Sequence, residues 1–232
     1  MFQFRSADTL DGGNFGWLKA RHHFAVTPTG NPANRPLGSL LVWNDDEIAP
    51  GRGFDLHGHS NMEIITYVRQ GKVTHRDSVG NEGLTAAGDV QVMSAGTGIR
   101  HAELNQGREP LRLFQIWLRP RTAGGAPRWE SRRFPQADRA NQFVILASGF
   151  PGDTDALPIG AEARVIGATL LSGSELTYEL GNFRYAYLAP ARGIVRVNNQ
   201  RLTEGDGIAT SDEPRLTIAA ESEAEIVLVT TN

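Results

Sequence analysis

The segment HGHSNMEIITYV (residues 57–68) places two histidines one residue apart, directly before an apolar run. In a β-strand, side chains two positions apart point to the same face, so His57 and His59 would present their imidazoles together. A second segment, GIRHAELN (residues 98–105), holds His101 and Glu103 at the same spacing. We therefore expect two inward-facing pairs that meet across a β-barrel and hold one metal ion.

The rest of the chain favours an all-β fold. Short apolar runs alternate with turn residues throughout, and the chain contains 26 glycines and 12 prolines. Such short runs with turn residues on both sides predict strands rather than helices, and many short strands indicate a sandwich or barrel. We predict strands at 39–43, 62–68, 111–118, 143–147, 185–189, 193–197, 215–220 and 225–230, with tight turns at 78–81 and 197–200. No long amphipathic helix is evident.

A faint internal repeat indicates two halves. GKVTH (71–75) followed by GLTAAGD (83–89) resembles GIVRV (193–197) followed by RLTEGD (201–206). Chance recurrence of Gly-Asp turns is the alternative to duplication. We expect an N-terminal metal-binding barrel over residues 1–130 and a C-terminal barrel over residues 131–232. The second barrel would lack metal ligands, because no histidine follows His101. The Gly-, Pro- and Arg-rich segment 120–134 is the expected linker.

The candidate ligands define the kind of metal. The chain has no cysteine, so an ion must be held by nitrogen and oxygen. Three histidines and one glutamate suit Fe(II), Mn, Co, Ni or Cu, and also Zn. On an octahedral ion, four protein ligands leave two positions open for O₂ or substrate. The alternative for a lone His-x-His pair is a surface pair or a hydrogen-bonded core group.

Other polar side chains near these segments need an assignment. Glu63 has the strand parity of His57 and His59, so we expect it to face inward and orient a histidine, with direct binding of the ion in competition with Glu103 as the alternative. We expect His75 to be exposed, and neither His22 nor His23 to reach the metal. Four further residues are expected to line the barrel or form its core, namely Met93, Phe114, Ile116 and Trp117.

The bulk composition excludes some partners. A net charge of −3 and a pI near 6.1 indicate no general attraction to nucleic acid or to anionic membranes. No segment approaches the roughly 20 apolar residues that a membrane-spanning helix needs. The first ten residues, MFQFRSADTL, have no apolar run of signal-peptide length. We expect a soluble, cytoplasmic protein.

The spacing of glycines and ligands resembles that of the cupin superfamily. Gly51, His57, His59, Glu63 and Gly71 resemble its first signature. Its second signature is matched by Gly88, His101 and Asn105. Within cupins, the sequence resembles the pirin family, and most closely its shorter bacterial members described as quercetin 2,3-dioxygenases. The resemblance is specific over residues 12–135 and weaker over 136–232. The segments that carry it are NFGWLKARHHF (14–24), GFDLHGHSNMEIITYVRQG (53–71), DSVGN (77–81), MSAGTGIRHAELN (93–105) and LFQIWLRP (113–120).

The resemblance implies a bicupin, with two jelly-roll barrels in one chain and a metal in the first barrel only. Carried over position by position, the ligands are His57, His59, His101 and Glu103. It further implies iron as the first choice of metal, cleavage of a flavonol such as quercetin with O₂, and Glu103 as the catalytic base. The alternative is a non-enzymatic, metal-binding regulator that acts on a partner protein.

Two positions depart from the family pattern. Gly58 stands where many members have proline, which loosens the turn between the two ligands. The segment AVTPTGNPANRPLGSL (25–40) replaces a more aromatic one near the expected pocket mouth.

Overall fold

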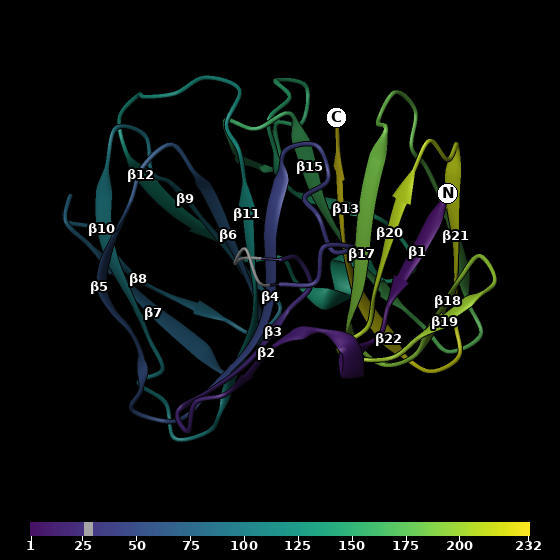
Figure 1. Cartoon of the computed structure of the whole chain (residues 1–232), viewed down its shortest axis with the longest axis horizontal. Coiled ribbons are helices and arrows are strands. Elements are labelled where there is room, and N and C mark those ends of the chain that lie inside the picture. The colour runs from purple at the N-terminus through teal and green to yellow at the C-terminus, as the bar shows by residue number, and fades with distance from the viewer. Residues whose placement is uncertain (26–29) are drawn as a thin grey trace.

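The computed structural model describes residues 1–25 and 30–232. Within these residues the structure is almost entirely β, and its helices are two short 3₁₀ turns, η1 (Ala7–Thr9) and η2 (Gln136–Arg139). Four sheets form two barrels that lie side by side (Figure 1). The all-β, two-barrel prediction is confirmed. Within the described part of the chain, no helix is long and apolar enough to cross a membrane.

The N-terminal barrel consists of a seven-stranded sheet and a four-stranded sheet. The order of the large sheet is β12 (Arg128–Arg132), β9 (Val90–Ser94), β6 (Glu63–Gln70), β11 (Leu111–Leu118), β4 (Leu40–Ile48), β3 (Leu18–His22) and β2 (Asp11–Asn14). The order of the small sheet is β5 (Gly53–His59), β10 (Ile99–Leu104), β7 (Lys72–Asp77) and β8 (Glu82–Ala86).

The C-terminal barrel has the same composition of sheets. The order of its large sheet is β1 (Phe2–Arg5), β20 (Gly207–Ser211), β17 (Tyr185–Arg192), β22 (Ala224–Thr231), β15 (Ala163–Leu170), β13 (Val144–Ser148) and β14 (Leu157–Pro158). The order of its small sheet is β16 (Glu175–Glu179), β21 (Arg215–Ala220), β18 (Val195–Val197) and β19 (Gln200–Leu202).

The two barrels repeat one topology. The neighbours β9, β6, β11 and β4 of the first barrel correspond in order to β20, β17, β22 and β15 of the second. The small sheets also correspond strand by strand, and the hairpins β7–β8 and β18–β19 contain the two predicted tight turns. The repeat seen in the sequence therefore reflects two structurally equivalent halves.

The unbroken apolar runs belong to strands that are covered on both faces. Along β22, Val227 and Val229 point into a core shared by both barrels, while Ile226 and Leu228 point into the core of the C-terminal barrel. The shared core lies where the two large sheets pack face to face (Figure 1). A strand buried on both faces loses the apolar/polar alternation that one solvated face would impose.

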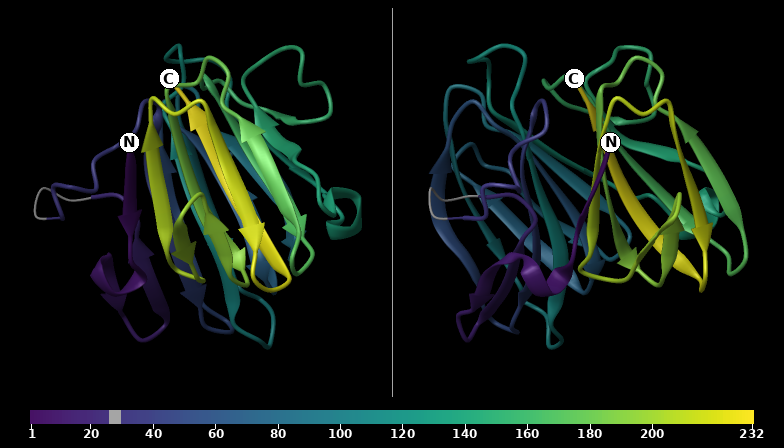
Figure 2. Two further views of the ribbon diagram at one scale, coloured as in Figure 1. Left: turned by 90° about the vertical axis from the view of Figure 1, so that its right-hand side faces the viewer. Right: turned by 45° about the vertical axis from the view of Figure 1, so that its right-hand side comes forward.

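The chain does not divide cleanly at the expected linker. The segment 120–134, expected to be the linker, contains β12, which pairs antiparallel with β9, so residues 128–132 belong to the sheet of the N-terminal barrel. A strand forms there because β9 would otherwise present an unpaired edge. The equivalent edge strand of the second barrel is β1, which comes from the opposite end of the chain and pairs with β20 (Figure 2). Part of the 25–40 segment, residues 26–29, lies outside the described residues.

Candidate metal centre

His57, His59 and His101 come together on two neighbouring strands. β5 and β10 pair antiparallel, with His101 opposite His57 and Ile99 opposite His59. The ring centroids are 4.5 Å apart for His57 and His101, and 5.0 Å apart for His59 and His101. The expectation that the two pairs face each other across the barrel is wrong. Adjacent strands lie only about 4.7–4.9 Å apart, which brings the rings close enough to share one ion.

The free ring nitrogens of these histidines fit a cation. One nitrogen from each ring lies within 4.8 Å of the others. Nδ1 of His57 lies 2.7 Å from the carbonyl oxygen of Asp55, which makes Nδ1 the hydrogen-bond donor and leaves Nε2 as a lone-pair donor. Nε2 of His59 and both ring nitrogens of His101 are buried and lack hydrogen-bond partners among the described residues. Buried nitrogens without partners are costly, and a divalent ion would satisfy them.

The environment of His59 and His101 keeps both imidazoles neutral. Burial, reinforced by the neighbouring His57, lowers the pKa of His59 to about 4. Burial also lowers the pKa of His101 to about 3, again with a contribution from His57. At neutral pH both rings are therefore uncharged, which is the form that binds a metal.

Glu103 lies in the same cavity, held by hydrogen bonds from the large sheet. Its Oε1 accepts bonds from Oγ1 of Thr66 at 2.9 Å and from Nε2 of Gln91 at 2.7 Å, and its Oε2 accepts a bond from Gln115. The pairing of β10 with β5 shifts register between His101 and Glu103, so that Glu103 lies opposite Phe54. Burial raises the pKa of Glu103, partly offset by the bond from Thr66. Its role as fourth ligand stays a prediction, because the three-nitrogen cluster does not include its carboxylate.

The cavity at the histidines has a volume of about 80 Å³ and contains polar groups that the sequence reasoning missed. Asp46 is only 2% exposed, and its Oδ1 lacks a hydrogen-bond partner among the described residues. Burial, together with the charges of Asp45 and Glu103, raises the pKa of Asp46 to about 8. The cavity is lined by Asn44, Asp46, Phe54, His57, His59, Ile64, His101, Glu103, Gln115 and Trp117. Asn44 and Asp46 were missed because the predicted strand ended at residue 43, whereas β4 continues to Ile48 and directs both side chains to the same face.

Glu63 does not face the histidines, so that expectation is wrong. Its neighbour Ile64 lines the cavity, and adjacent strand residues point to opposite faces. The carboxylate of Glu63 instead accepts a 2.6 Å hydrogen bond from Ser94, and Gly160 of the second barrel packs against it. The parity argument fails because the turn between β5 and β6 contains Asn61 in a left-handed conformation, with φ 50°. Parity does not carry through such a turn.

Among the remaining histidines, His22 and His23 agree with the expectation and His75 does not. Neither His22 nor His23 belongs to the cluster of possible ligand atoms, as predicted. His75 was expected to be exposed, and this is wrong, because its exposed fraction is 0%. On β7 it lies opposite Glu103 of β10, so it points into the barrel. The core and lining assignments of Met93, Phe114, Ile116 and Trp117 are confirmed.

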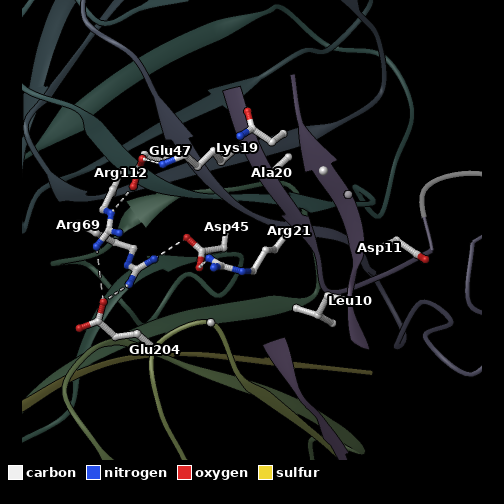
Figure 3. A pocket seen from close by; sticks show the side chains of 14 residues that line it. Leu10, Asp11, Lys19, Ala20, Arg21, Asp45, Glu47, Arg69, Arg112 and Glu204 are labelled. Atoms are coloured by element: carbon white, nitrogen blue, oxygen red, sulfur yellow. Dashed lines mark hydrogen bonds and ion pairs between the residues drawn. The ribbon is translucent and has the colours of Figure 1, made fainter. Parts of the chain in front are cut away.

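A larger pocket of about 510 Å³ lies at the seam between the barrels (Figure 3). Its charges pair with one another. Arg69 binds Asp45 of its own barrel and lies 3.0 Å from Glu204 of the other, and Arg112 lies 2.9 Å from Glu47. Since a ligand would have to replace these pairs, we interpret the pocket as part of the contact between the barrels and place the chemistry at the histidines.

Comparisons with known proteins agree with this geometry. The chain matches the family described as Pirin over residues 3–118, and the family described as Quercetinase C-terminal cupin domain over residues 145–230. A pirin-like protein of Caulobacter vibrioides is 56% identical over 229 residues, which cover 99% of each chain. A quercetin 2,3-dioxygenase of Escherichia coli is 36% identical over 229 residues, covering 98% of this chain and 97% of that protein.

Solved structures extend the match to three dimensions. The crystal structure of YhhW from Escherichia coli has a TM-score of 0.93 and 34% identity, and covers 100% of this chain and 98% of that one. A structure of the bacterial pirin YhhW in complex with nickel(II) has a TM-score of 0.91, with 34% identity over 100% of this chain and 99% of that one. With matches of this identity over nearly the full length of both chains, and with the same two-barrel fold, the chain belongs to the pirin family.

Proposed function

We propose that the chain is a metal-dependent dioxygenase that cleaves flavonols such as quercetin with O₂. The observation that carries the proposal is the cluster of His57, His59 and His101, whose ring nitrogens lie within 4.8 Å of one another beside two buried carboxyl groups in one small cavity. The names of its full-length relatives support the substrate class. We further propose iron as the ion, with Mn, Co, Ni, Cu or Zn as alternatives, and the cytoplasm as the location.

We place the metal-binding unit in residues 1–130 and a second unit without metal ligands in residues 131–232, except that β1 (Phe2–Arg5) pairs into the second barrel and β12 continues to Arg132 in the first. His57, His59 and His101 hold the ion, with Glu103 as the fourth ligand. A bound divalent ion would lower the pKa of a substrate hydroxyl group and make the resulting enolate reactive toward O₂.

The protein itself contributes a fixed carboxylate that accepts the proton and a small cavity that limits how much of the substrate can enter. Glu103 takes the proton of the substrate hydroxyl group at a carboxylate oxygen, while Thr66, Gln91 and Gln115 fix the orientation of that carboxylate. The cavity of about 80 Å³ is smaller than ordinary ligand pockets of roughly 300–1,000 Å³. Only the hydroxyl-bearing edge of a flavonol can therefore enter it, and the rest of the molecule lies outside.

The direct test is anaerobic loading with each candidate metal, followed by O₂-uptake measurements on a panel of flavonols and other enolisable phenols. We expect one metal ion per chain and chelator-sensitive turnover of quercetin. If no flavonol supports O₂ uptake with any of these metals, the dioxygenase proposal fails and a metal-binding regulator becomes the better account.

Two glutamates provide a matched pair for the ligand assignment. Glu103→Gln should reduce both metal content and turnover, because an amide binds hard cations poorly and cannot take the proton. Glu63→Gln should leave metal content unchanged, because Glu63 lies on the face of β6 that points away from the cavity and contacts Ser94. Metal analysis and rates should be measured under identical loading. Loss of metal from Glu63→Gln with retention by Glu103→Gln would reverse the assignment.

A further inference from the structure

A second group of polar side chains lies behind the candidate metal centre, outside the residues that line the cavity. His75 is fully buried, and its ring stacks on Trp129 with centroids 4.8 Å apart and planes 9° apart. Trp129 is itself confined, because a Cβ at Gly83 would lie only 2.1 Å from the edge of its ring. β12, which carries Trp129, thus fixes the plane of the His75 ring.

Asp77 fixes which nitrogen of His75 carries the proton. Nε2 of His75 lies 3.0 Å from Oδ2 of Asp77, and both side chains are fully buried. The same carboxylate accepts hydrogen bonds from the backbone of Val79 at 3.0 Å, and from the backbone and side chain of Asn81 at 2.9 Å each. A carboxylate so placed acts only as an acceptor, so Nε2 of His75 is the donor, and in the neutral tautomer of the ring Nδ1 keeps its lone pair.

Nδ1 of His75 and the ring nitrogens of the neighbouring His101 all lack hydrogen-bond partners in the described part of the chain. Nδ1 of His75 is buried without a hydrogen-bond partner among the described residues, and so are both nitrogens of His101. The two rings are neighbours, with centroids 5.4 Å apart. If one nitrogen of His101 binds an ion, the other must carry a proton, and a metal-bound histidine almost always donates that N–H to a nearby acceptor.

In the structure the two rings are neighbours but are not hydrogen-bonded to each other. We infer that His75 is a positioning residue for the metal centre, because its Nδ1 would accept a hydrogen bond from the nitrogen of His101 that does not bind the ion once an ion is held there. The resulting chain runs from the Asp77 carboxylate through His75 and His101 to the ion. It fixes the rotation of the His101 ring and makes His101 a stronger electron donor. The inference rests on the proposed metal site but not on the substrate, so it stands or falls by metal binding.

Two substitutions test the roles of the two ring nitrogens of His75 separately. His75→Gln can still donate to Asp77 from near the Nε2 position, but it has no acceptor at the Nδ1 position. His75→Asn keeps a polar group at the Nδ1 position and loses the link to Asp77. As a control, Asn81→Ala removes one hydrogen bond to Asp77 and leaves the contact between His75 and Asp77 in place.

The affinity for Co(II) should be measured on each full-length protein by competition with a chelator, together with the visible absorption bands of the bound ion. Circular dichroism and melting of the metal-free proteins check the fold. We expect His75→Gln to weaken binding by about 10- to 100-fold and to shift the Co(II) bands, as loss of such an outer partner typically does. His75→Asn should restore most of the affinity, and Asn81→Ala should bind like the wild type.

Wild-type affinity and unchanged bands in a folded His75→Gln protein would overturn the inference. Weaker binding by His75→Asn than by His75→Gln would also overturn it, because the acceptor end of the ring would then not matter. Failure of the wild-type protein to bind Co(II) would instead contradict the metal site itself. Absence of flavonol turnover alongside normal Co(II) binding would leave this inference intact and contradict only the proposed reaction.

Discussion

Asp46 illustrates how much one buried carboxyl group can change the behaviour of this protein. It lies on β4 among the residues that line the cavity, and burial is the main reason why its pKa rises to about 8. In the unfolded chain an aspartate has a pKa of ~3.9. Between these two values the unfolded state releases a proton that the folded state keeps. The free energy of unfolding of the metal-free protein should therefore fall as the pH rises from about 4 to about 8.

Asp46→Asn removes this contribution, because an amide does not ionise. In the metal-free protein, the variant and the wild type should melt at similar temperatures near pH 4. The variant should become progressively more stable than the wild type up to about pH 8, and the difference should then level off. Asp8→Asn, at an exposed carboxylate, is a control for the loss of one negative charge by the same substitution. A pH-independent difference for Asp46→Asn would show that Asp46 is ionised in the folded protein.

At the scale of the element, the close approach of β5 and β10 determines the geometry of the metal centre. The two strands come so near to each other at Gly53 that a Cβ there would lie 2.2 Å from the carbonyl oxygen of Glu103. Gly58, between the two histidines of β5, has no such contact, and its nearest neighbour would be 3.8 Å away on Arg100. A Cβ atom would therefore clash at Gly53 but fit at Gly58.

Gly53→Ala should destabilise the protein by about 1–3 kcal/mol, because the added methyl group forces the two backbones apart. It should also weaken metal binding, since the displaced backbone carries Glu103. Gly58→Ala should leave metal affinity unchanged and stability the same or slightly higher, because its Cβ meets only an ordinary contact. Urea unfolding and chelator competition on both variants check this. Equal effects of the two substitutions would contradict the packing argument.

At the scale of the whole molecule, the barrels are joined by a shared apolar core and by buried charges within it. Glu225 of β22 accepts hydrogen bonds from Tyr67 of the first barrel, from Arg139 at 2.6 Å and from Gln136 at 2.9 Å. The side chains of Arg139 and Glu225 are 1% and 4% exposed. This cluster therefore ties η2 and the second barrel to the large sheet that also supports Glu103.

Glu225→Ala should cost about 3–5 kcal/mol of stability, because it leaves the Arg139 guanidinium buried without its partner. Glu223→Ala is the matched control two residues away. Glu223 pairs with Arg192 at the surface, where the side chains are 60% and 50% exposed, and exposed pairs contribute about 0–1 kcal/mol. Denaturant unfolding of both variants gives the comparison. A loss below about 1 kcal/mol for Glu225→Ala would mean that the barrels are held together by the apolar core alone.

The local pattern of the sequence was sufficient for the most apolar strands, such as β6, β11 and β22, and for the pairing of ligands within a strand, whereas β9, β15 and β20 were not predicted. His57 and His59 share a face because the period of a strand is two residues, a property of the backbone that needs no tertiary information. The apolar runs, the tight turns at 78–81 and 197–200, and the repeat that became the hairpins β7–β8 and β18–β19 are local in the same sense. The resemblance of the motifs then predicted the two-barrel fold.

What only the tertiary structure decided is which strands meet and which face each side chain reaches. Glu63 turned to the second barrel because the left-handed turn at Asn61 breaks the parity that β5 began. His75 is buried because β10 and Trp129 of β12 cover it, and nothing near it in the sequence encodes that cover. β1 joins the far barrel because the unpaired edge of β20 lies there. Burial and pairing depend on contacts between distant segments, and a pattern of neighbouring residues does not specify them.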